Sequence, residues 1–384
     1  MDKDIMRLSI FCFYDKEGKV DRYVEFLISS LKEISTKLII VINGKVNNQG
    51  KEVFKKYTNQ ILIRQNIGYD FGAYGEVLCK IREEDRKKWD EIVFCNDTFY
   101  GPFLSFDSIF SFMRQSSADF WGLNSIDNGF FSHLQSYFLV FRKSILKDDI
   151  LYTYIKDIGI YLQTNDLKDI YAFFENGLFD FLLGKGYVYD SYTSTENYDI
   201  YDKPELCIKE CSLPLLKKKC FSFQYYKKRK FEELLSYISK NFMYDVRMIE
   251  QNAERIYGYK NNTQIEGTLK VCESFVTYYS EPIPRENIIS FIEENKDIYI
   301  YGMGVYARKI WVLFHKYMKI FKGFIVSDNQ DLQEQFLYGY VVNHYSNIME
   351  GSAIIIGCDL HNTREILQKL KKSDRVCVIW DKFF

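Results

Sequence analysis

The chain has 384 residues, enough for two or three domains, and its 47% hydrophobic content is that of a globular protein. The 51 Lys and Arg residues nearly balance the 52 Asp and Glu residues, which argues against a general nucleic-acid-binding protein. Nine cysteines, an odd count without paired spacing, favour reduced thiols. No apolar run approaches the ~18 residues of a membrane span, and we expect no signal peptide. These features predict a soluble, cytoplasmic protein.

Short apolar runs alternate with amphipathic stretches through the first hundred residues. Strands are predicted at 8–14, 38–42, 61–63 and 92–95, with helices from about 21, around 51–57 and over 73–85. Strands that are apolar on both faces and alternate with helices are typical of a mostly parallel sheet covered by helices. The sequence therefore predicts an α/β fold of the Rossmann-like kind.

Two polar clusters follow the third and fourth of these strands. Residues 66–74 read NIGYDFGAY, and residues 96–102 read NDTFYGP. Ligands of open α/β sheets bind beyond the carboxyl ends of the strands, so both clusters are expected to face one pocket. This edge of the sheet is the candidate active site.

The rest of the chain divides by pattern. Strands at 119–123 and 136–141 and a helix over 171–183 extend the first unit, residues 217–290 are helical and basic, and a new α/β pattern starts near 298. The predicted domains are 1–216, 217–290 and 291–384, the last a smaller Rossmann-like domain.

Each candidate residue of the first unit also has an ordinary structural interpretation. Asp97, between Asn96 and Thr98, offers hard oxygen ligands suited to Mg²⁺ or Mn²⁺ holding a diphosphate, but the same triplet is good turn chemistry. Asp70 stands among glycines that permit close backbone approach, or simply stabilises the start of a helix. His133 could donate to a phosphate or be a structural histidine.

Glu175 lies within an aromatic, apolar helix. Burial there would raise its pKa and suit it to act as a general base, whereas a position on the solvent side of the helix would be the ordinary alternative.

The last domain contains a glycine pattern after its first strand. Gly302, Gly304 and Ala307 open a helix, and Asp328 follows the next strand, as in sites that bind a pyrophosphate and a ribose. Small Rossmann-like domains that only pack or assemble carry similar glycines. The stretch 217–230 has seven cations and no acid, which suits an anionic membrane surface or a lipid diphosphate as well as a solvated face.

Taken together, the motifs of residues 7–220 resemble the rhamnan synthesis protein F family of putative rhamnosyltransferases. The matching segments are 66–74, 96–102, 119–123 and 133–141. The resemblance implies a GT-A-like fold that uses a nucleotide-activated sugar in cell-surface polysaccharide assembly. Segments 300–307, 323–328 and 354–357 of the last domain resemble the nucleotide-sugar-binding Rossmann domain of some sugar acetyltransferases. This resemblance implies nucleotide binding by Gly302, Gly304 and Asp328, or a role in assembly.

By this resemblance, Asp97 lies at the acidic metal motif and Glu175 at the position of the catalytic base. The motif here has one carboxylate where the usual one has two, so dependence on Mg²⁺ or Mn²⁺ stays open. The resemblance also implies a set of nucleotide-sugar-binding residues: Asn66, Gly68, Tyr69, Asp70, Gly72, Asn96, Thr98, His133 and Gln135.

The leading hypothesis is an inverting glycosyltransferase, a hexosyltransferase that takes a sugar from a dTDP- or UDP-linked donor. Glu175, or Asp97 if Glu175 is exposed, would deprotonate the acceptor hydroxyl. The acceptor would be a lipid-linked glycan at the inner face of the plasma membrane. The alternative is a catalytically silent nucleotide-sugar-binding or scaffold protein, and a nicotinamide-dependent enzyme is a third hypothesis. The donor sugar, the linkage and the oligomeric state are left open.

Overall fold

The computed structural model describes residues 5–126, 132–159, 166–195, 198–222, 228–259, 284–332 and 336–379. By its internal packing the chain forms two compact units. The first comprises Met1–Ile126, His133–Asn165 and Phe181–Thr268, and the second comprises Asp127–Ser132, Asp166–Asp180 and Leu269–Phe384. A segment from the middle of the chain is therefore part of the second unit.

An eight-stranded sheet forms the centre of the first unit, with strand order β3-β2-β1-β4-β8-β6-β7 and β9 paired with β6. The strands are β1 (Arg7–Phe13), β2 (Lys37–Asn43), β3 (Ile61–Arg64), β4 (Glu91–Asn96), β6 (Phe120–Ile126), β7 (His133–Leu134), β8 (Phe138–Arg142) and β9 (Tyr189–Ser194). Strand β1 pairs in parallel with β2 and β4, while β8 runs antiparallel to β4. The predicted α/β class with a mostly parallel sheet is confirmed.

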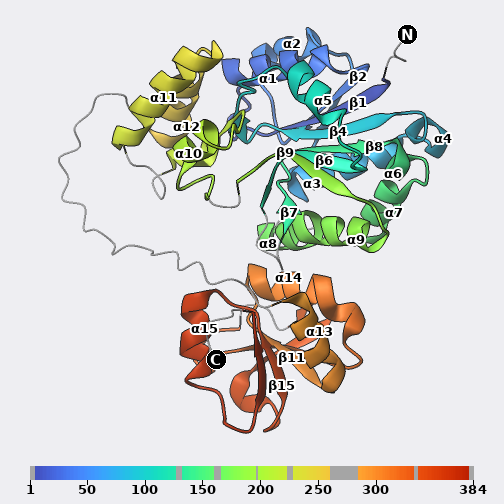
Figure 1. The fold of residues 1–384 in the computed structure, drawn as a ribbon, viewed down its shortest axis with the longest axis vertical. Coiled ribbons are helices and arrows are strands. Elements are labelled where there is room, and N and C mark those ends of the chain that lie inside the picture. Colours follow the sequence, from blue (N-terminus) through green and yellow to red (C-terminus); the bar gives the residue numbers. More distant parts are fainter. Residues whose placement is uncertain are drawn as a thin grey trace. The chain divides into compact units, whose positions relative to one another are not determined.

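Helices cover both faces of this sheet (Figure 1), with α1, α2 and α5 on one side and α3, α6 and α7 on the other. The helices are α1 (Arg22–Glu33), α2 (Asn48–Lys55), α3 (Tyr69–Lys80), α4 (Glu83–Arg86), α5 (Phe106–Met113), α6 (Lys143–Leu146), α7 (Ile150–Asp157), α9 (Phe179–Gly184) and α10 (Pro204–Lys209). Helix α1 buries Val24, Leu27 and Leu31, the residues whose helical spacing predicted it. Helix α3 starts at Tyr69, four residues earlier than predicted, because Gly68 adopts a left-handed conformation and ends the preceding loop.

The segment after residue 215 packs into the first unit. Strand β10 (Leu216–Lys217) pairs antiparallel with β5 (Phe99–Tyr100), and η3 (Lys218–Phe221), α11 (Lys228–Phe242) and α12 (Arg247–Tyr257) follow. Apolar residues of α11 and α12, such as Leu234 and Ile249, belong to the same hydrophobic core as the sheet. No helix in the described part of the chain is long and apolar enough to span a membrane.

The second unit is built on a six-stranded sheet with order β13-β14-β12-β11-β15-β16. Its elements are α13 (Arg285–Glu294), β11 (Ile298–Tyr301), α14 (Val305–Phe314), η4 (His315–Tyr317), β12 (Phe321–Val326), β13 (Phe336–Leu337), β14 (Tyr340–His344), η5 (Tyr345–Asn347), β15 (Ala353–Ile356), α15 (Leu360–Leu367) and β16 (Arg375–Val378). All pairs are parallel except β13 with β14. The predicted Rossmann-like character of this region is confirmed.

The mid-chain helix of the second unit is held by a buried charge cluster. This helix consists of α8 (Leu167–Ile170) and the π-helix η2 (Tyr171–Leu178), and both pack against α14. The Arg308 side chain, 3% exposed, forms ion pairs with Asp169 at 2.5 Å and Asp166 at 3.0 Å. Tyr338 donates a hydrogen bond to the same Asp169 carboxylate. The chain therefore uses charge pairing, as well as apolar packing, to keep this helix in the second unit.

Replacing Arg308 should loosen the second unit specifically. Arg308→Met leaves the largely buried Asp169 without its cation, which costs about 3–5 kcal/mol. Native-state hydrogen exchange of the α14 amides measures this loss. Lys316→Met is the matched control, because Lys316 is 52% exposed and 3.7 Å from Asp180, and its loss should cost less than about 1 kcal/mol. Equal effects of the two variants would contradict the account.

Candidate active site at the edge of the first sheet

The carboxyl ends of β1 and β4 meet at the point where the strand order of the first sheet reverses. The chain runs outward from β1 to β2 and β3 and then returns to place β4 on the other side of β1. Cys12 of β1 pairs with Asn96 of β4, so Asp97 lies directly beyond this pair. Such a switch point is where open α/β sheets bind ligands.

The Asp97 carboxylate is enclosed, with its side chain only 7% exposed, and it is fully engaged. Its Oδ2 accepts hydrogen bonds from the Tyr23 hydroxyl at 3.0 Å and the Lys218 ammonium at 3.2 Å. Lys218 also donates to the Tyr23 oxygen at 2.5 Å. Burial and the Asp97 charge raise the pKa of Tyr23 well above its usual value, so Tyr23 stays a donor. We call Asp97, Tyr23 and Lys218 the Asp97 cluster.

A second chain of hydrogen bonds runs beside the Asp97 cluster. Lys217 donates to the Thr98 hydroxyl at 2.6 Å, and Thr98 donates to the Asn96 oxygen at 2.7 Å. The amide nitrogen of Asn96 then donates to Asp70 at 2.6 Å. The Thr98 backbone N–H also donates to Asn96 Oδ1 at 3.1 Å, so the triplet forms the turn that the alternative interpretation expected. The residues Asn96, Asp97 and Thr98 therefore form both the turn and part of the polar site.

Strand β10 explains why the two lysines reach this edge. Its register pairs Leu216 with Tyr100 and Lys217 with Phe99, and the Lys218 N–H donates to the Thr98 carbonyl at 3.0 Å. Lys217 and Lys218 therefore point at the site residues. They are not part of an exposed basic surface, which was one of the interpretations of the stretch 217–230. Of that stretch, residues 223–227 and the side chains of 228–230 lie outside the described residues.

The predicted nucleotide-sugar loop after β3 is fixed by Arg64. Its guanidinium donates to the Ile67 carbonyl at 2.7 Å and to Asn43 at 2.8 Å. A Cβ at Gly72 would lie 2.3 Å from the Ile67 oxygen, so this close contact requires glycine. Asn43 also donates to the carbonyl of Tyr69, which has a positive φ of 51°. The loop is held rigidly at the same edge of the sheet as Asp97.

One side-chain oxygen of this loop, that of Asn66, is buried without a hydrogen-bond partner in the described residues. A buried acceptor without a partner is costly and is expected to find a donor when a ligand binds.

The remaining residues predicted for this site lie on other elements. His133 and Gln135 are both buried, and their ring and amide nitrogens lie 3.2 Å apart. His133 belongs to β7 and pairs with Ile126, and the Gln135 N–H donates to the Asn124 carbonyl, so both lie beside the last residues of β6. Glu175 is in η2, which belongs to the second unit. It raises the pKa of Lys309 in α14, although burial lowers that pKa more strongly. Glu175 and Asp97 thus belong to different units, and the role of Glu175 as a base stays a prediction.

In the second unit the glycine pattern lies at the carboxyl end of β11. Gly302 has a φ of +111°, and a Cβ there would lie 2.9 Å from the Gly357 carbonyl. Gly304 precedes α14, and Asp328 is exposed and accepts a hydrogen bond from the Ser346 N–H at 2.8 Å, which lowers the pKa of its carboxyl. Close packing accounts for Gly302, so nucleotide binding by Gly302, Gly304 and Asp328 stays a prediction.

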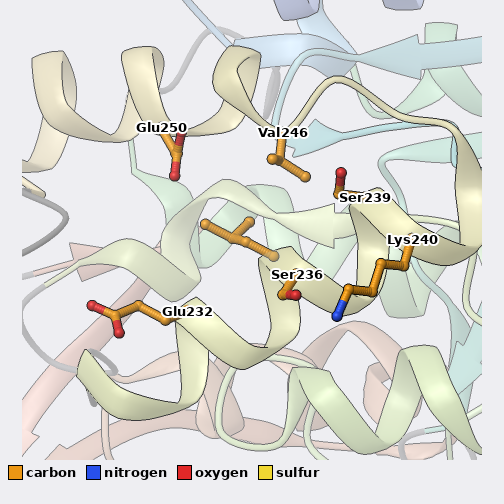
Figure 2. A pocket seen from close by; sticks show the side chains of 7 residues that line it. Glu232, Ser236, Ser239, Lys240, Val246 and Glu250 are labelled. Atoms are coloured by element: carbon orange, nitrogen blue, oxygen red, sulfur yellow. The ribbon is translucent and has the colours of Figure 1, made fainter.

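Two further features concern ligands. A cavity of about 420 Å³ lies between α11 and the start of α12 (Figure 2). Its lining comprises Glu232, Leu235, Ser236, Ser239, Lys240, Val246 and Glu250. None of these was predicted as a site residue. In the described ranges no group of three or more His, Cys, Asp or Glu side chains could hold a metal ion, and the predicted Mg²⁺ or Mn²⁺ stays a prediction.

Helix α12 braces the loop after β1. Arg255 donates to Asp15 at 2.6 Å and to Asp21 at 2.7 Å, and Asn252 donates to Asp21 at 2.6 Å. Burial alone would raise the pKa of Asp15, but hydrogen bonds from Arg255 and from two backbone N–H groups outweigh burial and lower it. This bracing holds the loop that leads from β1 to Tyr23.

The fold and this polar edge define a mostly parallel α/β protein with a buried, lysine-paired carboxylate at its switch point. Residues 38–317 match the rhamnan synthesis protein F family, and the chain belongs to that family. It is 29% identical over 181 residues to the virulence protein VirA of Vibrio anguillarum, which covers 47% of this chain and 57% of VirA. It is 27% identical over 169 residues to the uncharacterized protein y4gN of Sinorhizobium fredii, covering 42% of each. The chain therefore spans about half the length of these relatives.

Two solved structures are distant likenesses of this chain. The inositol-1-phosphate CTP transferase of T. maritima has a TM-score of 0.35 and 12% identity, covering 62% of this chain and 97% of that one. The glucosyl-3-phosphoglycerate synthase of Mycobacterium tuberculosis has a TM-score of 0.26 and 11% identity, covering 47% and 80%.

The lowered pKa of Asp15 predicts a pH dependence of stability. Because the pKa of Asp15 is lower in the folded than in the unfolded chain, its charge stabilises the fold above pH about 4, and this contribution disappears as the pH falls through the folded-state value. Asp15→Asn should therefore cost about 1.5–3 kcal/mol at pH 7 and less at pH 3. Urea denaturation across this pH range measures the difference. Asp202→Asn, at an exposed carboxylate, should show neither effect. A cost of Asp15→Asn that does not change with pH would refute the assignment.

Proposed function

We propose that this chain is a glycosyltransferase that takes a sugar from a nucleoside-diphosphate sugar and adds it to a glycan in polysaccharide assembly. The observation that carries the proposal is the Asp97 cluster, buried at the switch point of a mostly parallel sheet beside a rigid glycine loop. Membership of the rhamnan synthesis protein F family supports a role in polysaccharide synthesis. A dTDP- or UDP-linked donor, with rhamnose as its sugar, is part of the proposal.

In this proposal each element of the edge has a task. The diphosphate of the donor lies against the Asp97 cluster, and the loop with Asn66 and Gly68 contacts the nucleoside or the sugar. The oxygen of an acceptor hydroxyl attacks the anomeric carbon, a new C–O bond forms, and the bond from that carbon to the diphosphate breaks. The hydroxyl proton passes to a carboxylate, for which Asp97 is the candidate within the first unit. Donors fixed at the edge stabilise the departing diphosphate.

The acceptor and the cellular site follow from the same proposal. A lipid-linked glycan at the inner face of the plasma membrane would be elongated by a cytoplasmic enzyme that binds the membrane peripherally. Lys217 and Lys218 are engaged at the site, so membrane contact would need other cations.

A second candidate function is a binding or scaffold protein without catalysis. The observation that favours it is the complete pairing of the Asp97 carboxylate, which is also what a purely structural charge cluster would show. A scaffold of this kind would bind nucleotide-sugar without cleaving it.

Donor turnover separates these alternatives. Asp97→Asn should lower the release of dTDP or UDP from the sugar nucleotide by about 100-fold or more, because it removes either the base or the partner that orients Lys218. Gly304→Val should retain turnover, and it should fold, since a Cβ at Gly304 meets no atom within 4 Å. Chromatography of the released nucleotide measures the turnover of both variants.

Two other outcomes would contradict the proposal in different ways. Turnover lost in Gly304→Val and kept in Asp97→Asn would move the site to the second unit. Calorimetric binding of the donor by the wild type without any turnover would favour the scaffold.

A further inference from the structure

The cation bound to Asp97 in this structure is the ammonium of Lys218. It is 3.2 Å from Oδ2, and Tyr23 donates to the same oxygen. The other oxygen faces the Tyr14 N–H at 3.4 Å. A divalent cation coordinated by Asp97 would have to displace a hydrogen bond from Oδ2 or share Oδ1 with the Tyr14 N–H, and in either place the Lys218 ammonium would repel it. The residues around Asp97 therefore do not fit a directly bound Mg²⁺ or Mn²⁺.

Lys218 is placed to contact a ligand as well as Asp97. An ammonium has three N–H donors, and two of those of Lys218 go to Asp97 and Tyr23. Its side chain is 15% exposed, so it is not sealed from solvent. The ammonium lies 2.5 Å from the Tyr23 oxygen and 4.9 Å from the centre of the Tyr23 ring, and the hydrogen bond limits its freedom. Within the described part of the chain, Lys218 is thus a fixed positive charge with a third donor to offer.

Lys217 supports the same edge from the other side. Its ammonium lies 4.2 Å from the centre of the Tyr137 ring and donates to Thr98. Through Thr98 and Asn96 it fixes the position of Asp70. The two lysines balance the charges of Asp70 and Asp97, so that an approaching diphosphate is not repelled by two carboxylates.

We propose that Lys218 performs at Asp97 the task of a divalent cation: it neutralises the carboxylate and donates to the diphosphate of the nucleotide-sugar. Lys217 is a positioning residue. Donor binding at this edge is accordingly independent of divalent metal. This inference rests on the proposed function, because it names the group that holds the donor.

Calorimetric titration of the full chain with UDP and dTDP tests the inference. In EDTA the wild type should bind one of them within about twofold of its affinity in Mg²⁺ or Mn²⁺. Lys218→Gln should weaken binding at least tenfold, and Lys218→Arg should recover part of it, because arginine keeps the positive charge. Lys219→Gln is the matched control, since Lys219 is the exposed neighbour in the same turn, and binding should not change.

A second variant distinguishes a loss of nucleotide binding from a folding defect. Lys218→Gln leaves Asp97 buried without its cation, so circular dichroism accompanies each titration. Asp97→Asn combined with Lys218→Gln removes both charges, and it should fold and still bind at least tenfold more weakly than the wild type.

Four results would overturn the inference. Binding that EDTA abolishes and Mg²⁺ or Mn²⁺ restores would assign the task to a metal. Lys218→Gln binding as tightly as Lys219→Gln would remove Lys218 from the site. Both leave the proposed function standing. Absence of nucleotide binding by the wild type, or binding lost only in Gly304→Val, would instead overturn the proposed function together with the inference.

Discussion

The need to pair one buried carboxylate organises the polar edge of the first unit. Asp97 directly follows β4, a strand that is buried along its whole length, and an unpaired charge there would be very costly. The chain supplies the partner from a segment more than a hundred residues later, through Lys218. Strand β10, η3 and the helices that follow are therefore part of the same fold as the sheet, and the site exists only when they are in place.

Further polar contacts turn this pairing into a rigid arrangement. Tyr23 connects Asp97 to α1, and Arg255 of α12 holds the loop through which the chain reaches that helix. On the other side, Arg64 fixes the glycine loop against β2 and β3. Each polar group at the edge is held by partners from different elements, which is the preorganisation that a site for an anionic ligand requires.

Local patterns in the sequence predicted the sheet and the polar residues at its edge. Strands such as Ile92–Cys95 are apolar runs bounded by turn residues, so the location of Asn96, Asp97 and Thr98 at a strand end followed directly. The positions of Lys217 and Lys218 at this edge could not be predicted in the same way. They depend on pairing between β10 and β5, which brings Lys217 to Thr98, 119 residues away, and a run of lysines resembles a solvated surface. For the same reason the helix containing Glu175 was predicted, but not the unit into which it packs.

The central claim is that a nucleotide-sugar binds at the Asp97 edge of the first unit, and a crystal structure with bound UDP or dTDP tests it most directly. The account predicts density for the diphosphate within hydrogen-bond distance of the Lys218 ammonium, with the nucleoside near Asn66. Density for the diphosphate at Gly302–Gly304 of the second unit, with the Asp97 cluster unchanged and empty, would contradict it.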